Sequence, residues 1–433
     1  MTNDAPSVCL IGVTGFGRVH YNDLVDEHRR GRMRLRAVTV WNPDECPEQV
    51  ALLRRLGCEI FDDWRAMLDA CRGQCQLGFI PTGIHWHRPM TIAALEAGMN
   101  VFVEKPVAAT VQDVRAMQAA ERASGRWVAV GYQSMYAAEM PFIKETILSG
   151  RLGRLRSVKC YALWPRNDAY YARTAWAGRL RLGDDWILDS PFHNALAHRV
   201  NMGLFLAGRA LAGSAEPARV KAELYRARPI ESCDTAAARI ETREGISVSF
   251  WLTHVPDDGA AHEGPVLEAR CDRGRLLWRL DPGDGAKNRL RIESEGEVIV
   301  DMPSESGFEG TPLRLAIMDR LRAKLVDPSA FAYGLAAAGA EVVAANAIHD
   351  AVDPADFPAE SVSRVGTGPE TRWQVKGLSG LIRRAFDEGK LFSEMGVPWA
   401  VAGAADAAEY AAGRRDFPAR ALRKSPLPVD VSR

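Results

Sequence analysis

The sequence predicts a chain of two architectures, a doubly wound parallel α/β sheet followed by an α+β domain built on a predominantly antiparallel open sheet. Between residues 7 and 130, short apolar runs alternate with helical segments, as in parallel sheets with crossover helices. Beyond residue 217, expected strands follow one another without intervening helices, which favours an antiparallel or mixed sheet. The chain has 433 residues, 47% of them hydrophobic and 25% charged, which is typical of a globular protein of two or three domains.

The first part is expected to contain short buried strands, each bounded by glycine, asparagine, proline or a charged residue. These strands are expected at 7–11, 35–41, 58–61, 76–80, 100–103 and 127–130. Helices are expected between them at 17–28, 48–56, 63–73, 89–97 and 111–124. The fourth of these is expected to run from Pro89 to Ala97 and to be stopped by Gly98.

The second part starts with an expected helix over 138–148 and a long strand over 155–163. A loop rich in Trp, Tyr and Arg follows over 164–186, and then an expected helix over 194–206. The later strands are expected at 218–226, 235–241, 246–254, 265–271, 275–280, 288–293 and 297–301, and the later helices at 312–326, 333–350 and 378–388. We therefore expect three segments: a parallel-sheet domain over 1–130, an open-sheet domain over 131–365, and a helical extension and tail over 366–433.

Charge and composition exclude some classes of partner. Lys+Arg and Asp+Glu both number 55, so the chain has no overall attraction to nucleic acid or an anionic membrane. No apolar run approaches the ~18 residues of a membrane span, and the first residues lack signal-peptide features, so we expect a cytoplasmic protein. Of eight cysteines, only Cys71 and Cys75 form a close pair, and no second pair with zinc spacing accompanies them. Free thiols in a reducing cytosol and no metal site are expected.

A glycine-rich loop, residues 12–17 (GVTGFG), joins the first expected strand to the first expected helix. A pyrophosphate is expected at this helix N-terminus, where backbone N–H groups lack helical partners. Gly12 allows the tight turn, whereas Thr14 departs from the usual G-x-G-x-x-G pattern. The alternative is a glycine-rich turn without a ligand. The candidate cofactor-binding residues of this loop are Gly12, Thr14, Gly15, Phe16 and Gly17.

Two further motifs follow expected strands. Residues 102–106 (FVEKP) place Glu104 and Lys105 at the carboxyl end of a strand, where such sheets bind ligands. The Lys105 ammonium is suited to stabilising a developing alkoxide, although a surface lysine before a proline is the alternative. Residues 81–87 (PTGIHWH) are expected to line the same crevice. Packing beside the cofactor is favoured over metal binding for its two histidines. The cofactor-binding candidates here are Pro81, Thr82, His85, His87, Glu104 and Lys105.

A polar cluster is expected on one helix in residues 188–201 (LDSPFHNALAHRVN). Asn194 and His198 are spaced i, i+4, and Asn201 continues the same face at i, i+3. Three polar side chains on one face of an otherwise apolar helix indicate a site, although a single helical histidine is more often structural.

Together these motifs resemble the glucose–fructose oxidoreductase / inositol dehydrogenase / MocA family (Gfo/Idh/MocA), over about residues 8–352. The resemblance implies an N-terminal Rossmann domain and places Lys105 between nicotinamide and substrate. The family has a helix reading D-x-x-x-H-x-x-D with a catalytic histidine, which His198 matches. Asn194 and Asn201 stand at the two acidic positions, and Met135 stands where an Arg is often found.

The resemblance implies an NAD(P)-dependent oxidoreductase acting on a CH–OH group of a sugar, cyclitol or related polyol. His198 is the expected general base, Lys105 the expected alkoxide stabiliser and Asn194 the expected orienting group. Trp164 and Arg166 are suited to stacking on a sugar and binding its hydroxyls, with an aromatic core or subunit interface as the alternative. Further substrate-binding candidates are Asp189 and Asn201.

Asn42, after the second strand, is a further cofactor-binding candidate. With Asp44 and Glu45 beside it, NAD is preferred, and NADP is not excluded. Two other function classes stay open. One is a glycosidase or lyase that uses bound NAD for transient oxidation, and the other is a non-catalytic ligand sensor that has lost the acidic positions. A homo-oligomer is expected, because many strands and few helices leave one sheet face for a subunit contact.

Overall fold

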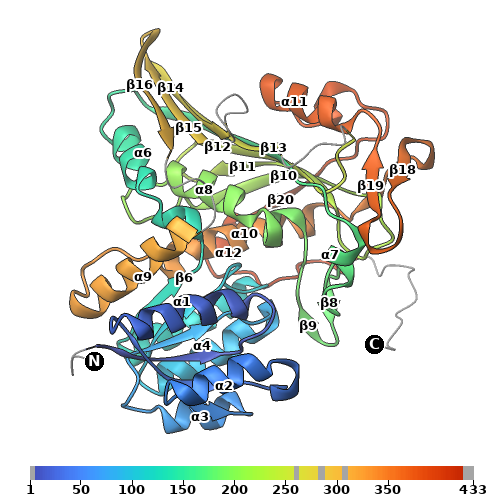
Figure 1. The fold of residues 1–433 in the computed structure, drawn as a ribbon. Coiled ribbons are helices and arrows are strands. Elements are labelled where there is room, and N and C mark those ends of the chain that lie inside the picture. Colours follow the sequence, from blue (N-terminus) through green and yellow to red (C-terminus); the bar gives the residue numbers. More distant parts are fainter. Residues whose placement is uncertain (1–4, 258–262, 281–287, 305–310, 423–433) are drawn as a thin grey trace. The chain divides into compact units, whose positions relative to one another are not determined.

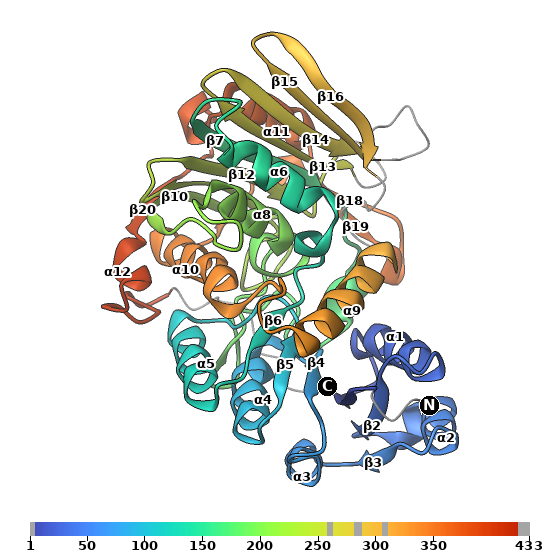
Figure 2. The ribbon, with the colours of Figure 1, turned by 90° about the vertical axis from the view of Figure 1, so that its left-hand side faces the viewer.

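A computed structural model describes residues 5–257, 263–280, 288–304 and 311–422. The chain divides into two compact units (Figures 1 and 2). The first unit comprises 1–108, 112–136 and 310–338, and the second comprises 109–111, 137–309 and 339–433.

A six-stranded parallel sheet forms the first unit, in the order β3-β2-β1-β4-β5-β6. Its strands are β1 (Ser7–Ile11), β2 (Arg34–Thr39), β3 (Glu59–Phe61), β4 (Leu77–Ile80), β5 (Asn100–Val103) and β6 (Val128–Val130). Its crossover helices are α1 (Gly17–Arg29), α2 (Pro47–Arg55), α3 (Trp64–Ala70), α4 (Ile84–Glu96) and α5 (Val111–Ser124). β1, β4 and β5 lie together in the middle of the sheet, so the loops that follow them share one edge. The predicted doubly wound sheet is confirmed.

A late segment returns to complete this unit. Helix α9 (Thr311–Val326) contacts the 3-10 helix Gln133–Tyr136. The backbone N–H of Val130, at the end of β6, donates to the carbonyl of Tyr333 at 2.7 Å. The unit is therefore discontinuous in sequence.

A ten-stranded mixed sheet forms the second unit, along the path β16-β15-β14-β13-β7-β12-β11-β10-β17, with β20 also paired to β10. Its strands are β7 (Leu155–Leu163), β10 (Pro217–Arg226), β11 (Thr235–Thr242), β12 (Ser247–Thr253), β13 (Glu263–Cys271), β14 (Gly274–Leu280), β15 (Asn288–Ser294), β16 (Glu297–Ser304), β17 (Ala355–Asp356) and β20 (Gly403–Asp406). Only the β7–β12 and β10–β17 pairs are parallel. The predicted, predominantly antiparallel open sheet is confirmed.

Helices cover both faces of this sheet around β7 and β12. α8 (Ala197–Ala207) packs on the face of Val158 and Val248, and α11 (Leu378–Glu388) packs with Tyr161 and Trp251 on the other face. The expectation that one face stays bare is therefore wrong here, because the C-terminal extension covers it. The unit's other elements are α6 (Glu139–Leu148), α7 (Asp168–Ala172), α10 (Leu335–Ala351), α12 (Ala408–Ala411) and the hairpins β8 (Arg181–Leu182) with β9 (Asp185–Trp186) and β18 (Val362–Val365) with β19 (Arg372–Val375).

Two helix starts differ from the prediction by three residues or more. α4 begins at Ile84 and contains Pro89, because buried Ile84 and His87 anchor its first turn. The helix expected from residue 194 is instead a π-helical turn, Pro191–Ala195, followed by α8. Among the described helices, none is long and apolar enough to cross a membrane.

Candidate functional site

The glycine-rich loop connects β1 to α1 as predicted. Gly12 has φ +91° and Gly15 has φ +56°, both in the region that favours glycine. Gly17 opens the helix, and a Cβ added there would lie 2.7 Å from the Gly12 carbonyl oxygen. Phe16 occupies the N-cap of α1, and it provides no side-chain cap hydrogen bond. Thr14, Gly15 and Phe16 are exposed, so the helix N-terminus is open to an anion.

Glu104 links this helix to the end of β5. Its carboxylate is buried, accepts a hydrogen bond from the backbone N–H of Lys105 at 3.1 Å, and contacts His20 Nε2 on α1 at 2.8 Å. Gly131 leaves the necessary space, since a Cβ there would lie 2.7 Å from Glu104 Oε1. Lys105 itself is part-buried directly after the strand. Glu104 therefore fixes the backbone that carries Lys105.

Sequence reasoning missed His20 and Gly131. His20 lies one turn into α1, and its ring contacts the rings of Phe16, Phe79 and Phe102. The available signal was its i+3 spacing from Gly17 at the start of the helix. The acceptor for its imidazole, 84 residues away, is identified only by the fold.

His87 contacts both predicted motifs at the carboxyl ends of β4 and β5, residues 81–87 and 102–106. Its Nδ1 lies 2.8 Å from the Pro106 carbonyl oxygen, and its Nε2 lies 3.1 Å from the Thr82 carbonyl oxygen. Burial lowers its pKa, which favours the neutral ring with one donor. These contacts fit the predicted packing role and leave the ring nitrogens facing carbonyls rather than a metal. Pro81 also lies beside the loop, with its Cγ 3.6 Å from a Cβ placed on Gly17.

The other predicted residues of this unit lie around the same edge of the sheet. Thr82 Oγ1 donates to Met90 Sδ at 3.5 Å, and the part-buried His85 ring lies 5.4 Å from that of Trp86. Asn42 is exposed after β2 and donates through Nδ2 to Glu45 Oε1 at 2.9 Å. The acidic group near Asn42 thus lies where a ribose-recognising group is expected.

Within the second unit, Asp189 organises the predicted substrate residues. It is buried, accepts from Asn194 Nδ2 at 2.6 Å, and accepts from the Gly178 backbone N–H at 2.6 Å. Asp189 therefore anchors the aromatic loop to the π-helical turn. His198 and Asn201 are buried on α8. Because α8 starts after Leu196, Asn194 does not share a regular helix face with His198, which corrects that prediction.

A second histidine of this segment was missed. His193 is fully buried, and its Nδ1 lies 3.0 Å from Glu341 Oε1 on α10. A carboxylate that holds one imidazole nitrogen is the arrangement that orients a proton-transfer histidine. Asp189 and His193 have the Asp-x-x-x-His spacing that the family motif requires. That signal was present in the sequence, five residues before the aligned motif.

The aromatic and arginine-rich loop packs within the second unit. The Arg166 guanidinium lies 5.4 Å from the Trp164 ring centroid and 4.7 Å from that of Tyr170. Arg228 donates to the Arg166 carbonyl oxygen at 2.7 Å. Trp164 and Arg166 stay part-exposed, which leaves the predicted stacking role open.

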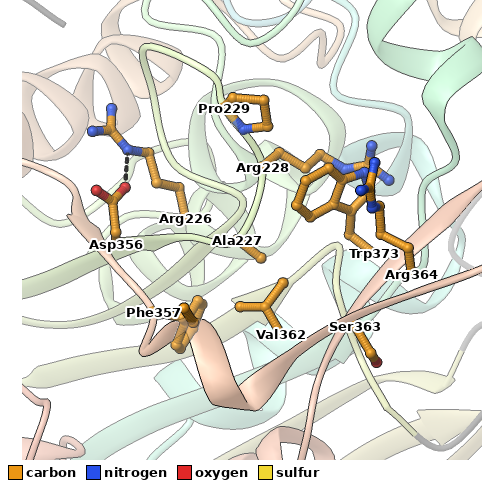
Figure 3. Close-up of a pocket in the computed structure, with 11 residues that line it drawn as sticks. Arg226, Ala227, Arg228, Pro229, Asp356, Phe357, Val362, Ser363, Arg364 and Trp373 are labelled. Atoms are coloured by element: carbon orange, nitrogen blue, oxygen red, sulfur yellow. Dashed lines mark hydrogen bonds and ion pairs between the residues drawn. The ribbon is translucent and has the colours of Figure 1, made fainter. Parts of the chain in front are cut away.

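The second unit also contains a pocket of about 550 Å³ where β10 meets the C-terminal extension. Figure 3 shows Arg228 and Arg364 beside Trp373 on one side of the pocket. The ion pair of Arg226 with Asp356 lies on the other side. Its described lining includes none of the predicted site residues.

Comparison with known proteins identifies both units. A family model described as "Oxidoreductase family, NAD-binding Rossmann fold" matches residues 7–132, and the "GFO/IDH/MocA C-terminal domain" matches residues 142–277. Together they cover more than half of the chain.

Individual relatives agree with these matches. An inositol 2-dehydrogenase/D-chiro-inositol 3-dehydrogenase of Halalkalibacterium halodurans is 27% identical over 194 residues, covering 45% of this chain and 50% of the relative. A dTDP-3,4-didehydro-2,6-dideoxy-alpha-D-glucose 3-reductase of Streptomyces antibioticus is 30% identical over 260 residues, covering 58% of this chain and 71% of that protein. The chain thus spans about half the length of the first relative.

A solved structure supports the fold. The WlbA dehydrogenase of Bordetella pertussis, in complex with NADH and UDP-GlcNAcA, matches with a TM-score of 0.60 and 20% identity. The match covers 79% of this chain and 95% of that one.

Proposed function

Because this chain belongs to the Gfo/Idh/MocA family of oxidoreductases, we propose that it transfers hydride between a nicotinamide cofactor and a sugar, cyclitol or related polyol. The observation that carries the proposal is the edge of the first-unit sheet. There an uncapped helix N-terminus follows β1, and a part-buried lysine, fixed by Glu104, follows β5. The names of the relatives, an inositol dehydrogenase and a deoxysugar reductase, support the substrate class.

The glycine loop fits a dinucleotide. Glycine is required at two positions of this loop. A Cβ at Gly12 would lie 2.9 Å from the Trp41 ring, and a Cβ at Gly17 would lie 2.7 Å from the Gly12 carbonyl oxygen. The backbone N–H groups of the first turn of α1 would hold the pyrophosphate. When bound, a nicotinamide supplies the hydride acceptor. Asp44 and Glu45 would repel a 2′-phosphate, so we propose NAD over NADP.

Two side chains have separate roles, one in stabilising charge and the other in transferring the proton. Lys105 would donate to the substrate oxygen and stabilise its negative charge as the C–H bond breaks. His198 would take the hydroxyl proton, with Asn194 orienting the substrate. His193, held by Glu341, is the rival for the proton role. Lys105 belongs to the first unit and both histidines to the second, so their meeting on one substrate stays a prediction.

Two experiments test the proposal. Thermal unfolding with NAD and NADP identifies the cofactor, and nicotinamide absorbance with a polyol panel detects redox turnover. NAD retained through a turnover with no net redox change would favour a glycosidase or lyase. Cofactor binding without any turnover would favour a ligand sensor.

A homo-oligomer and a cytoplasmic location stay predictions. Sedimentation of the purified protein would test the oligomer.

A further inference from the structure

Three cysteines from two parts of the sequence meet in the first unit. Cys9 lies in the middle of β1, Cys71 directly follows α3, and Cys75 lies two residues before β4. Their Sγ atoms all lie within 4.8 Å of one another. The three residues are 0%, 1% and 4% exposed, respectively. Sequence spacing pairs only Cys71 with Cys75, and the sheet supplies the third thiol.

The local backbone builds this sulfur cluster. The Cys75 N–H donates to the Cys71 carbonyl oxygen at 3.0 Å, so the two residues are one turn apart. Gly78 lies opposite Cys9 in the sheet, and a Cβ there would lie 3.6 Å from Cys9 Sγ. The thioether sulfur of Met99 lies 3.7 Å from Cys9 Sγ. The cluster therefore consists of three buried thiols, with the buried Met99 thioether beside Cys9.

We propose that Cys9, Cys71 and Cys75 bind one soft, thiophilic metal ion as thiolates, with the Met99 thioether as a fourth neighbour. Metal–sulfur bonds of about 2.3 Å separate the sulfurs by roughly 3.8–4.0 Å in tetrahedral or trigonal geometry. The observed separations thus need shifts of less than about 1 Å to close around an ion. Thiolate and thioether ligands select ions such as Cu(I), Zn²⁺ and Cd²⁺ over hard cations. Binding releases the thiol protons to solvent and involves no electron transfer.

The cluster lies beneath an exposed turn and near a positive charge. Residues 72–74, between Cys71 and Cys75, are exposed, so the turn that carries these two thiols lies at the protein surface. The charge of Arg36 acts on both cysteines and offsets part of the thiolate charge. The turn leads into the start of β4, at the end of the sheet opposite the glycine loop. This site is therefore separate from the one proposed for the cofactor.

Titration of the reduced, metal-free full-length protein with Cd²⁺ tests the proposal. We expect one equivalent to produce thiolate-to-metal charge-transfer absorption and to protect Cys71 and Cys75 from alkylation, read by mass spectrometry. Cys71→Ser should weaken binding by at least about 100-fold, because it removes a direct ligand. Cys58→Ser is the matched control. Its thiol is also buried but donates to the Leu35 carbonyl oxygen at 3.0 Å, so binding should be unchanged.

The outcomes separate metal binding from other roles. Absence of the absorption band in the folded wild-type protein would overturn the proposal, whatever the folding of the variants. Equal affinity in Cys71→Ser would also overturn it. A disulfide among the three cysteines after mild oxidation, with no Cd²⁺ bound by the reduced protein, would assign the cluster to redox chemistry instead.

Discussion

Replacing Gly17 by alanine tests the glycine loop most sharply. The new Cβ would lie 2.7 Å from the Gly12 carbonyl oxygen, closer than real Cβ atoms approach backbone. Gly12 cannot shift freely, since its N–H donates to the Thr39 carbonyl oxygen at 3.0 Å. Relief must therefore come from displacing the first turn of α1, and such overpacking costs about 1–3 kcal/mol. We expect NADH affinity to fall at least about tenfold, which corresponds to about 1.4 kcal/mol.

Gly31→Ala is the matched control at the other end of α1. Gly31 has φ +68° and no atom within 4 Å of an added Cβ, so alanine meets backbone strain of about 1–2 kcal/mol but no clash. Urea unfolding should show comparable losses of stability in the two variants, whereas fluorescence titration should show weaker NADH binding only in Gly17→Ala. Wild-type NADH affinity in folded Gly17→Ala would refute the assignment of this loop.

Three further predictions follow from the structure. His198→Ala should lower polyol turnover by roughly 100-fold, as expected on loss of a proton-transfer group. If steady-state assays show this loss only for His193→Ala, and not for His198→Ala, the proton-transfer role belongs to His193. Gly131→Ala should destabilise the first unit by about 1–3 kcal/mol in urea unfolding, because its Cβ would lie 2.7 Å from Glu104 Oε1, and an unchanged midpoint would refute the packing argument. Burial raises the pKa of Asp234 to about 6, compared with about 3.9 in the unfolded chain. Between these two pH values the folded state binds more protons than the unfolded state, so the protein loses stability as the pH rises from about 4 to about 6. Asparagine does not titrate, so from pH 4 to pH 7 the free energy of unfolding of Asp234→Asn should improve by about 2–3 kcal/mol relative to wild type. If chemical denaturation gives the same difference between variant and wild type at both pH values, this argument is wrong.

Elements defined by local patterns were predictable from the sequence. Buried apolar runs bounded by turn residues identified every strand of the parallel sheet, with bounds that agree to within two residues. The same logic located the glycine loop and the lysine after β5. These features depend on neighbours in the sequence, which is why a single sequence reveals them.

Features set by distant contacts were not predictable. β17 and β20 are short strands whose pairing to β10 depends on the fold rather than on their own sequence. The π-helical turn Pro191–Ala195 is a local exception, because a 3.6-residue pattern does not reveal it, and it changes which residues share a helix face. The contact of His193 with Glu341 joins residues 148 positions apart. The sheet edge that carries the glycine loop and Lys105 was therefore predictable in outline, whereas the partners of its polar groups were not.

The most direct test of the proposed function is nicotinamide absorbance during incubation of the protein with NAD and a panel of cyclitols and sugars, in wild type and Lys105→Met. We predict NADH formation with at least one polyol, a loss of roughly 100-fold or more in turnover for the variant, and little change in its affinity for NADH. Full turnover in folded Lys105→Met, or no hydride transfer in either direction by wild-type protein that binds the cofactor, would contradict the account.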